Sequence, residues 1–109
     1  IMHALWGMGQ MMFTKTLIVV DHDVNAQDLA EVAWVAGNHI DPKRDVIFVE
    51  GPVDVLDHAA PVMGFGSKMG IDATRKWRSE GFERDWPDAI RMDDKTKKYI
   101  DSIWEKLGI

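Results

Sequence analysis

Two aspartates separated by one residue, Asp21 and Asp23, directly follow an apolar run that ends at Val20. In α/β folds, ligands bind outside the carboxyl ends of strands. Carboxylate oxygens are the ligands that hard divalent cations prefer. One hypothesis is therefore a stand-alone α/β binding module that holds a cation at this strand end. A polar turn leading into a helix cap at Asn25 is the simpler explanation of the same residues.

A basic residue, Lys15, stands just ahead of the same apolar run. A lysine in this place is either a solvated charge at the start of a strand or a contact for an anion. Periodicity favours the solvated charge, and nothing in the local pattern identifies an anion.

Other motifs for catalysis or metal binding are weak. The histidines show no i, i+4 spacing and no H-x-x-x-H motif, so surface or core roles are expected. The segment from Gly64 to Gly70 lacks the G-x-G-x-x-G spacing and a strong preceding strand, which favours a tight loop over a nucleotide site. Ser67 has no evident base beside it, so a hydrolase triad is not indicated. The four histidines are His3, His22, His39 and His58.

Composition narrows the class of protein further. The 109 residues include no cysteine, which excludes a disulfide scaffold and a cysteine-ligated zinc site. Thirteen basic and eighteen acidic residues give a formal charge of −5, and this balance argues against general binding to nucleic acid. No apolar run approaches the length of about 20 residues that a membrane span needs. One domain is expected at this length, and five tryptophans suit core or interface anchors.

The chemistry-bearing residues need a scaffold, and hydrophobic patterning predicts an α/β fold. Residues 16–20 and 45–50 are apolar runs rich in β-branched residues, typical of strands buried on both faces. Between them, residues 25–40 carry apolar side chains at helical spacing. Asn25 and Asp28 are expected to cap the start of this helix, and Asp41-Pro42 to stop it. The three elements predict a right-handed βαβ unit as the basis of the sheet, with helices at its flanks.

The beginning of the chain is unusually apolar. Residues 1–13 are expected to form one helix, weakened by two glycines, with apolar groups around much of its surface. An element this apolar is normally covered on several sides. The first residue is isoleucine, and no capping residue or basic leader precedes the helix. The pattern favours a fragment of a longer polypeptide.

The second half of the chain is less regular until its end. We expect a short helical turn at 54–58, a third strand at 71–74 and a polar loop at 78–92 anchored by Phe82 and Trp86. Asp93 or Asp94 is predicted to cap a last helix that ends at Gly108. Its apolar stripe consists of Ile100, Ile103, Trp104 and Leu107.

Several motifs together resemble the carboxyl-terminal domain of UbiD-type decarboxylases. The resemblance runs nearly from end to end, so residues 1–109 are expected to form one such domain. Residues 66–77 are the most specific part of the match. The matching segments are residues 3–15, 17–25, 41–46, 51–54, 56–59 and 66–77.

This resemblance implies an α/β domain of a carboxy-lyase that decarboxylates aromatic or α,β-unsaturated acids without oxidation, as in ubiquinone or menaquinone precursors. The family's cofactor is prenylated FMN, bound with a manganese-type divalent ion and a monovalent cation. The family's catalytic carboxylates and metal ligands belong to the preceding domains. The resemblance therefore implies that this chain holds no catalytic residue or metal and is inactive by itself. It also implies a cytoplasmic enzyme that meets membranes through its substrate.

The resemblance assigns roles to a few residues of this chain. Lys15 matches the lysine that contacts the cofactor phosphate in family members. Pro61, Val62 and Met63, followed by Gly64, match a loop that closes over the aromatic acid substrate. The last helix matches one that packs on a neighbouring subunit, so the expected partners are the preceding domains and further copies in a dimer or hexamer.

Overall fold

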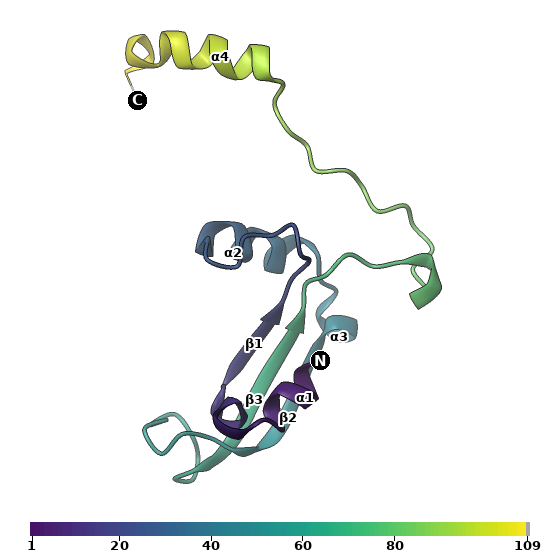
Figure 1. The fold of residues 1–109 in the computed structure, drawn as a ribbon, viewed down its shortest axis with the longest axis vertical. Coiled ribbons are helices and arrows are strands. Elements are labelled where there is room, and N and C mark those ends of the chain that lie inside the picture. Colours follow the sequence, from purple (N-terminus) through teal and green to yellow (C-terminus); the bar gives the residue numbers. More distant parts are fainter. Residues whose placement is uncertain (109) are drawn as a thin grey trace. The chain divides into compact units, whose positions relative to one another are not determined.

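The computed structural model describes residues 1–108. The chain divides into two compact units, one of Ile1–Lys76 and one that begins at Trp77. Figure 1 shows a sheet in the first unit and helix α4 (Asp94–Ile103) in the second. Within residues 1–108 the helices are too short and too polar to traverse a lipid bilayer.

The predicted α/β class is confirmed, but the strand pairing differs from the βαβ prediction. The sheet of the first unit has the order β1-β3-β2. Its strands are β1 (Thr16–Val19), β2 (Val46–Pro52) and β3 (Phe65–Asp72). β1 is parallel to β3, and β2 is antiparallel to β3. β2 therefore cannot be the parallel partner of β1, because the loop at 53–64 reverses the chain and inserts β3 between them.

β3 spans a glycine-containing segment whose sequence does not indicate a strand. A loop was expected over Gly64–Gly70 and a strand only at 71–74, yet the strand already begins at Phe65. Gly66, Lys68 and Gly70 alternate on the buried face of β3. A Cβ on Gly70 would lie 3.2 Å from the Trp6 ring and would overlap the sulfur of Met2. Glycine is therefore used here for close packing rather than for a turn.

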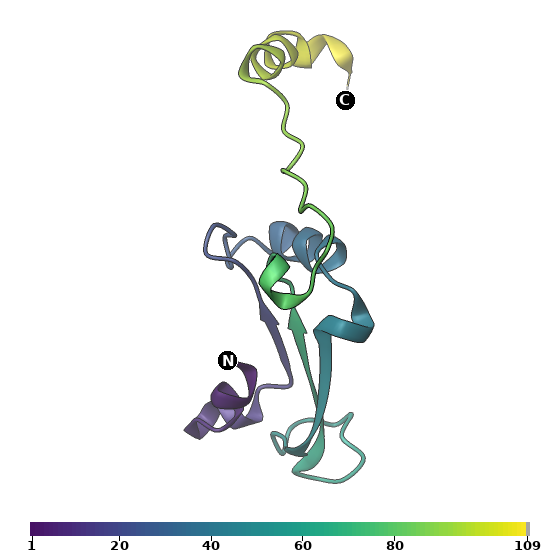
Figure 2. The same cartoon turned by 90° about the vertical axis from the view of Figure 1, so that its right-hand side faces the viewer.

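The N-terminal segment is not one helix. Helix α1 spans Met2–Trp6, and a separate 3-10 helix, η1, spans Gly9–Phe13. The break falls between two glycines, and Gly9 has a φ of +46°. Figures 1 and 2 show α1 against the sheet near the start of β1. Trp6 is buried there, and its indole N–H donates to the carbonyl of Thr14 at 2.9 Å.

The connection from β1 to β2 contains α2 (Leu29–Asn38) and α3 (Pro42–Asp45). The cap of α2 is Asp28 rather than Asn25: its Oδ1 accepts from the N–H groups of Ala30 and Glu31 at 3.0 and 3.1 Å. Asn25 instead forms a local turn with Gln27. The expected stop at Asp41-Pro42 is the start of α3, where Asp41 is the cap and proline takes the first turn.

The second unit contains short helices and a long irregular segment. Its 3-10 helices are η2 (Arg78–Glu80) and η3 (Trp104–Leu107), and α4 lies between them in sequence. Asp93 caps α4 by accepting from the N–H of Thr96 at 2.9 Å, as expected. Phe82 and Trp86 pack against each other with ring centroids 5.6 Å apart.

Candidate functional site

Lys15 is held by an acidic residue that is distant in the sequence. Its Nζ lies 2.8 Å from both carboxylate oxygens of Asp57. The hydrogen bond from Lys15 holds the pKa of Asp57 below its usual range. The backbone of Lys15 is also fixed, because its carbonyl accepts from the N–H of Met69 in β3 at 2.9 Å. Lys15 is therefore anchored at both ends, while 51% of its side chain stays exposed.

Asp57 belongs to the loop between β2 and β3. Its Oδ1 also accepts from the N–H of Ala59 at 3.1 Å, and its own N–H donates to the carbonyl of Asp54 at 3.0 Å. Successive turns therefore replace the short helical turn expected at 54–58. The loop closes where the N–H of Val53 donates to the carbonyl of Gly64 at 3.1 Å, with Gly64 at a φ of +76°.

The predicted substrate-facing residues lie in the same loop. Pro61, Val62 and Met63 are exposed, and the Met63 side chain is 83% accessible. The structure brings this loop to Lys15 through Asp57, which sequence reasoning had given no role. Leu56-Asp57-His58-Ala59 is one of the resembling motifs, but a pair separated by 42 residues leaves no local signal.

A buried lysine fixes the segment just before Lys15. Lys68 is only 5% exposed, and its Nζ donates to the carbonyl of Met12 at 2.7 Å. The same ammonium lies 5.5 Å from the centroid of the Trp6 ring. Together with the hydrogen bond from Trp6 to Thr14, these contacts hold residues 12–15 on the sheet. The backbone just before Lys15 is consequently tied to β3 and to Trp6.

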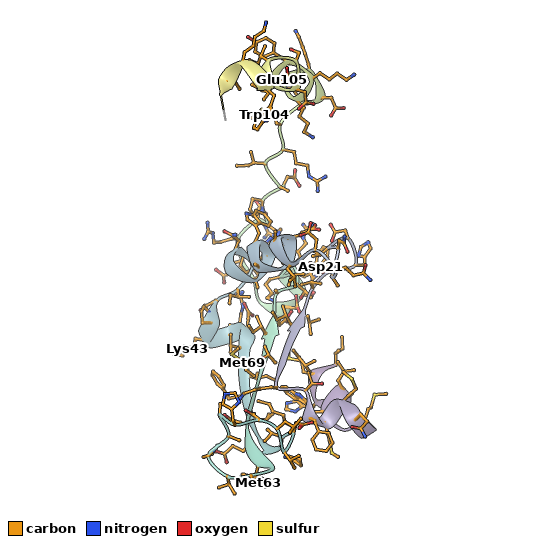
Figure 3. All side chains as sticks on the ribbon, turned by 90° about the vertical axis from the view of Figure 1, so that its left-hand side faces the viewer. Asp21, Lys43, Met63, Met69, Trp104 and Glu105 are labelled. Carbon is orange, nitrogen blue, oxygen red and sulfur yellow. The ribbon has the colours of Figure 1, made fainter. Side chains whose placement is uncertain are left out.

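The other candidate, Asp21 with Asp23, lies at the opposite end of the sheet. Figure 3 shows Asp21 at one end of the sheet and Met63 at the other. The Oδ2 of Asp21 accepts from the backbone N–H of Arg75 at 2.7 Å, which ties the chain after β3 to the end of β1. In residues 1–108 no group of three or more histidine, aspartate or glutamate side chains is placed to hold a metal ion. Asp21 therefore stabilises the fold through its hydrogen bond to Arg75.

A cluster of charges stabilises the end of β3 near Asp21. The buried ammonium of Lys76 lies 3.2 Å from Asp72 Oδ1 and 3.6 Å from Asp45 Oδ1. Asp45 also accepts from Arg44 and from the N–H of Asp41. Burial acts to raise the pKa of Asp45, but these hydrogen bonds and the charge of Lys76 outweigh it and lower that pKa. Lys76 therefore joins Asp45 of α3 to Asp72 at the end of β3.

The last helix exposes apolar side chains within the second unit. Trp104 and Leu107 are each about half exposed, and Ile100 and Ile103 are partly exposed. Gly108 has the left-handed φ of +67° expected after a helix end. The predicted stripe is thus present on α4 and η3 and is only partly covered.

A mixed sheet with a paired lysine beside an exposed loop defines an α/β domain with one candidate binding end. The family model of the 3-octaprenyl-4-hydroxybenzoate carboxy-lyase C-terminal domain, UbiD_C, matches residues 1–73. The chain belongs to this family, and the resemblance found in the sequence is confirmed.

Solved structures of UbiD-class decarboxylases are similar to the chain. The vanillic acid decarboxylase of Sedimentibacter hydroxybenzoicus in its closed form has a TM-score of 0.77 at 29% identity, covering 96% of this chain and 22% of that chain. The UbiD-class enzyme HmfF from Pelotomaculum thermopropionicum, in complex with FMN, has a TM-score of 0.54 at 37% identity, covering 67% of this chain and 17% of that chain.

A relative with higher identity is an uncharacterized protein of Aquifex aeolicus (strain VF5). It is 52% identical over 107 residues, which covers 98% of this chain and 22% of that protein. The chain therefore spans less than a quarter of the length of this relative.

Proposed function

We propose that the chain is the C-terminal oligomerisation and active-site-closing domain of a prenylated-FMN-dependent decarboxylase in the cytoplasm. Its substrates are aromatic or unsaturated acids of the kind met as ubiquinone or menaquinone precursors. The observation that carries the proposal is that Lys15 and the loop at 53–64 meet at one end of the sheet, joined by Asp57.

Lys15 is assigned the role of binding the phosphate of the cofactor. About half of the Lys15 side chain is accessible, and its backbone is held by hydrogen bonds. An accessible ammonium on a fixed backbone suits a group that binds a dianion. The FMN present in the HmfF structure supports a flavin phosphate as that dianion. Prenylated FMN, when bound, supplies the electron sink for loss of carbon dioxide. The manganese-type ion and the monovalent cation are assigned to the preceding domains.

Substrate contact is assigned to Pro61, Val62 and Met63. These apolar side chains are exposed at a loop tip, and an aromatic ring is the kind of surface that such groups cover. The catalytic acid-base groups are assigned to the preceding domains, so the chain by itself is expected to be inactive. Its own contribution is to bind the phosphate and exclude water above the substrate.

One face of the sheet exposes apolar side chains, which supports the proposal that the preceding domains pack against it. Phe48 on β2 is 72% exposed and pairs with Met69, which in turn pairs with Thr16 on β1. Cross-strand partners share one face of a sheet, so the partly exposed Ile18 lies on the same face. An apolar face this open is normally buried against another domain or chain. The stripe on α4 and η3 is assigned to contact with a second copy, in a dimer or hexamer.

The test compares Lys15→Met with Lys43→Met in the full-length protein. Lys43 is an exposed lysine of the same unit, on α3, and serves as the matched control. Loss of one charge-assisted hydrogen bond costs about 1.5–3 kcal/mol, which predicts FMN binding about ten- to a hundredfold weaker in Lys15→Met. Riboflavin, which lacks the phosphate, should bind both variants equally. Equal FMN affinity of the two variants would remove Lys15 from the site.

Decarboxylation itself is tested separately. The full-length protein loaded with prenylated FMN should release carbon dioxide from aromatic acids, and residues 1–109 by themselves should not. Carbon dioxide release by the isolated chain would refute the assignment of the catalytic groups to other domains.

A further inference from the structure

Asp57 connects two parts of the proposed site that are otherwise separate in the sequence. Both of its carboxylate oxygens lie 2.8 Å from Lys15 Nζ, and its side chain is only 13% exposed. The carboxylate is thus largely enclosed, and the ammonium is its charged partner. Separating the pair would break both of these charge-assisted contacts, so the pair is expected to persist when another anion binds Lys15.

Lys15 has capacity for a second anion while it holds Asp57. An ammonium carries three N–H donors, and the contacts to Asp57 occupy two directions at most. Half of the side chain remains accessible to solvent. A phosphate can therefore bind the outer side of the ammonium, which places the positive charge between two anions.

Asp57 also makes several hydrogen bonds within its own loop. Its side chain accepts from Ala59, its N–H donates to Asp54 and its carbonyl accepts from the N–H of Ala60 at 3.1 Å. The next residue is Pro61, the first of the proposed substrate-facing residues. A restraint on the Asp57 carboxylate is consequently a restraint on the turn that leads into Pro61–Met63.

We propose that Asp57 is a positioning residue that links phosphate binding at Lys15 to the order of the loop at 53–64. This link rests on the proposed function. A bound phosphate immobilises the ammonium, and the ammonium immobilises the carboxylate and its turn. The loop is then held most firmly when the phosphate site is filled.

The experiment is amide hydrogen exchange of residues 54–63 in the full-length protein, with FMN or riboflavin as the probe. FMN should slow exchange in this segment by about threefold or more, since ordering a turn suppresses its local opening. Riboflavin should not slow it, because it lacks the phosphate.

Asp57→Asn is the main variant. Asparagine keeps an oxygen that accepts from the N–H of Ala59, so the turn is retained. It removes the negative charge that pairs with Lys15, so the link between phosphate and loop is lost. Asp54→Asn is the matched control, because Asp54 accepts from Leu56 N–H in the same kind of turn at 2.8 Å. FMN should protect the loop in wild type and Asp54→Asn, but not in Asp57→Asn or Lys15→Met.

Two results would overturn the link: protection by FMN that survives in Asp57→Asn, or equal protection by riboflavin. Absence of FMN binding to the wild-type protein is a different outcome, because it would refute the proposed function and the link together. FMN binding that is normal in Asp57→Asn while loop protection is lost supports the link directly, since a merely unfolded variant would lose both.

Discussion

The ammonium of Lys68 lies 5.5 Å from the centroid of the Trp6 ring, inside the first unit. This relationship joins the central strand to the first helix of the chain. It places a charge in an enclosed position, where cation–π attraction and one hydrogen bond to Met12 offset the loss of hydration. The N-terminal segment thereby packs on one face of the sheet.

Lys68→Met should destabilise the first unit. The variant keeps an apolar stem but leaves the carbonyl of Met12 without its donor, at a cost of about 1–3 kcal/mol. Denaturant unfolding of the full-length protein measures the loss. Lys43→Met, at an exposed position, should change stability by less than about 0.5 kcal/mol. Equal stability of the two variants would show that the buried contact contributes nothing.

Gly70→Ala should also destabilise the packing of α1 on β3. The added Cβ would lie 3.1 Å from Ile47 and 3.2 Å from Trp6, so neighbouring side chains must move, at a cost of about 1–3 kcal/mol. Gly37→Ala in α2 is the control, because a Cβ there meets nothing within 4 Å. A helix favours alanine over glycine, so the control should be neutral or stabilising by up to about 1 kcal/mol. Thermal unfolding distinguishes the two.

Asp45 should make the first unit sensitive to acid. Its pKa in the folded state is lowered, because hydrogen bonds and the charge of Lys76 outweigh burial. The stability it contributes is therefore complete above the unfolded value of about 3.9 and is lost as the pH falls through the folded pKa. Unfolding free energy measured between about pH 5 and pH 2 should fall more gently in Asp45→Asn than in wild type. Identical slopes would contradict this role.

Trp104→Glu should weaken self-association of the full-length protein. Trp104 belongs to the half-exposed apolar stripe, and a charge buried in an interface without a partner is strongly unfavourable. Sedimentation velocity at matched concentrations should show a shift from the assembled species towards smaller ones. Lys98→Glu introduces the same side chain at an exposed position of α4 and should leave the assembly intact. A wild-type protein that sediments as a monomer would refute the proposed contact.

Sequence patterning predicted the elements whose signal is local. The β-branched run at 16–20 gave β1, and the spacing after Asp93 gave α4 with its cap. β3 was mostly missed because glycine has a poor strand propensity, and its use here depends on Met2 and Trp6, which pack from far away in the sequence. The parallel βαβ prediction failed for a related reason, since the position of β3 between β1 and β2 is set by long-range pairing.

The candidate site was predicted in part. The family resemblance selected Lys15 and the Pro61–Met63 loop, and the structure places them at the same end of the sheet. Their roles are predictions that flavin binding to the Lys15→Met variant tests. Asp57 was not selected, because nothing in its local sequence distinguishes a carboxylate that pairs with a lysine from one that forms a turn. The pairing of Asp57 with Lys15 is visible only in the folded structure.

The insertion of β3 between its neighbours also governs the order in which the first unit can assemble. β2 and β3 are joined by a single loop and are therefore close in sequence. Pairing of Thr16 with Met69 instead brings together two segments that are far apart in sequence. Contacts between distant segments form late, because closing a long loop costs more entropy than closing a short one. The β2–β3 hairpin is therefore expected to form first during refolding, with β1 and Lys15 docking onto it last. The end of the sheet proposed to bind phosphate would then form only at the final step of folding.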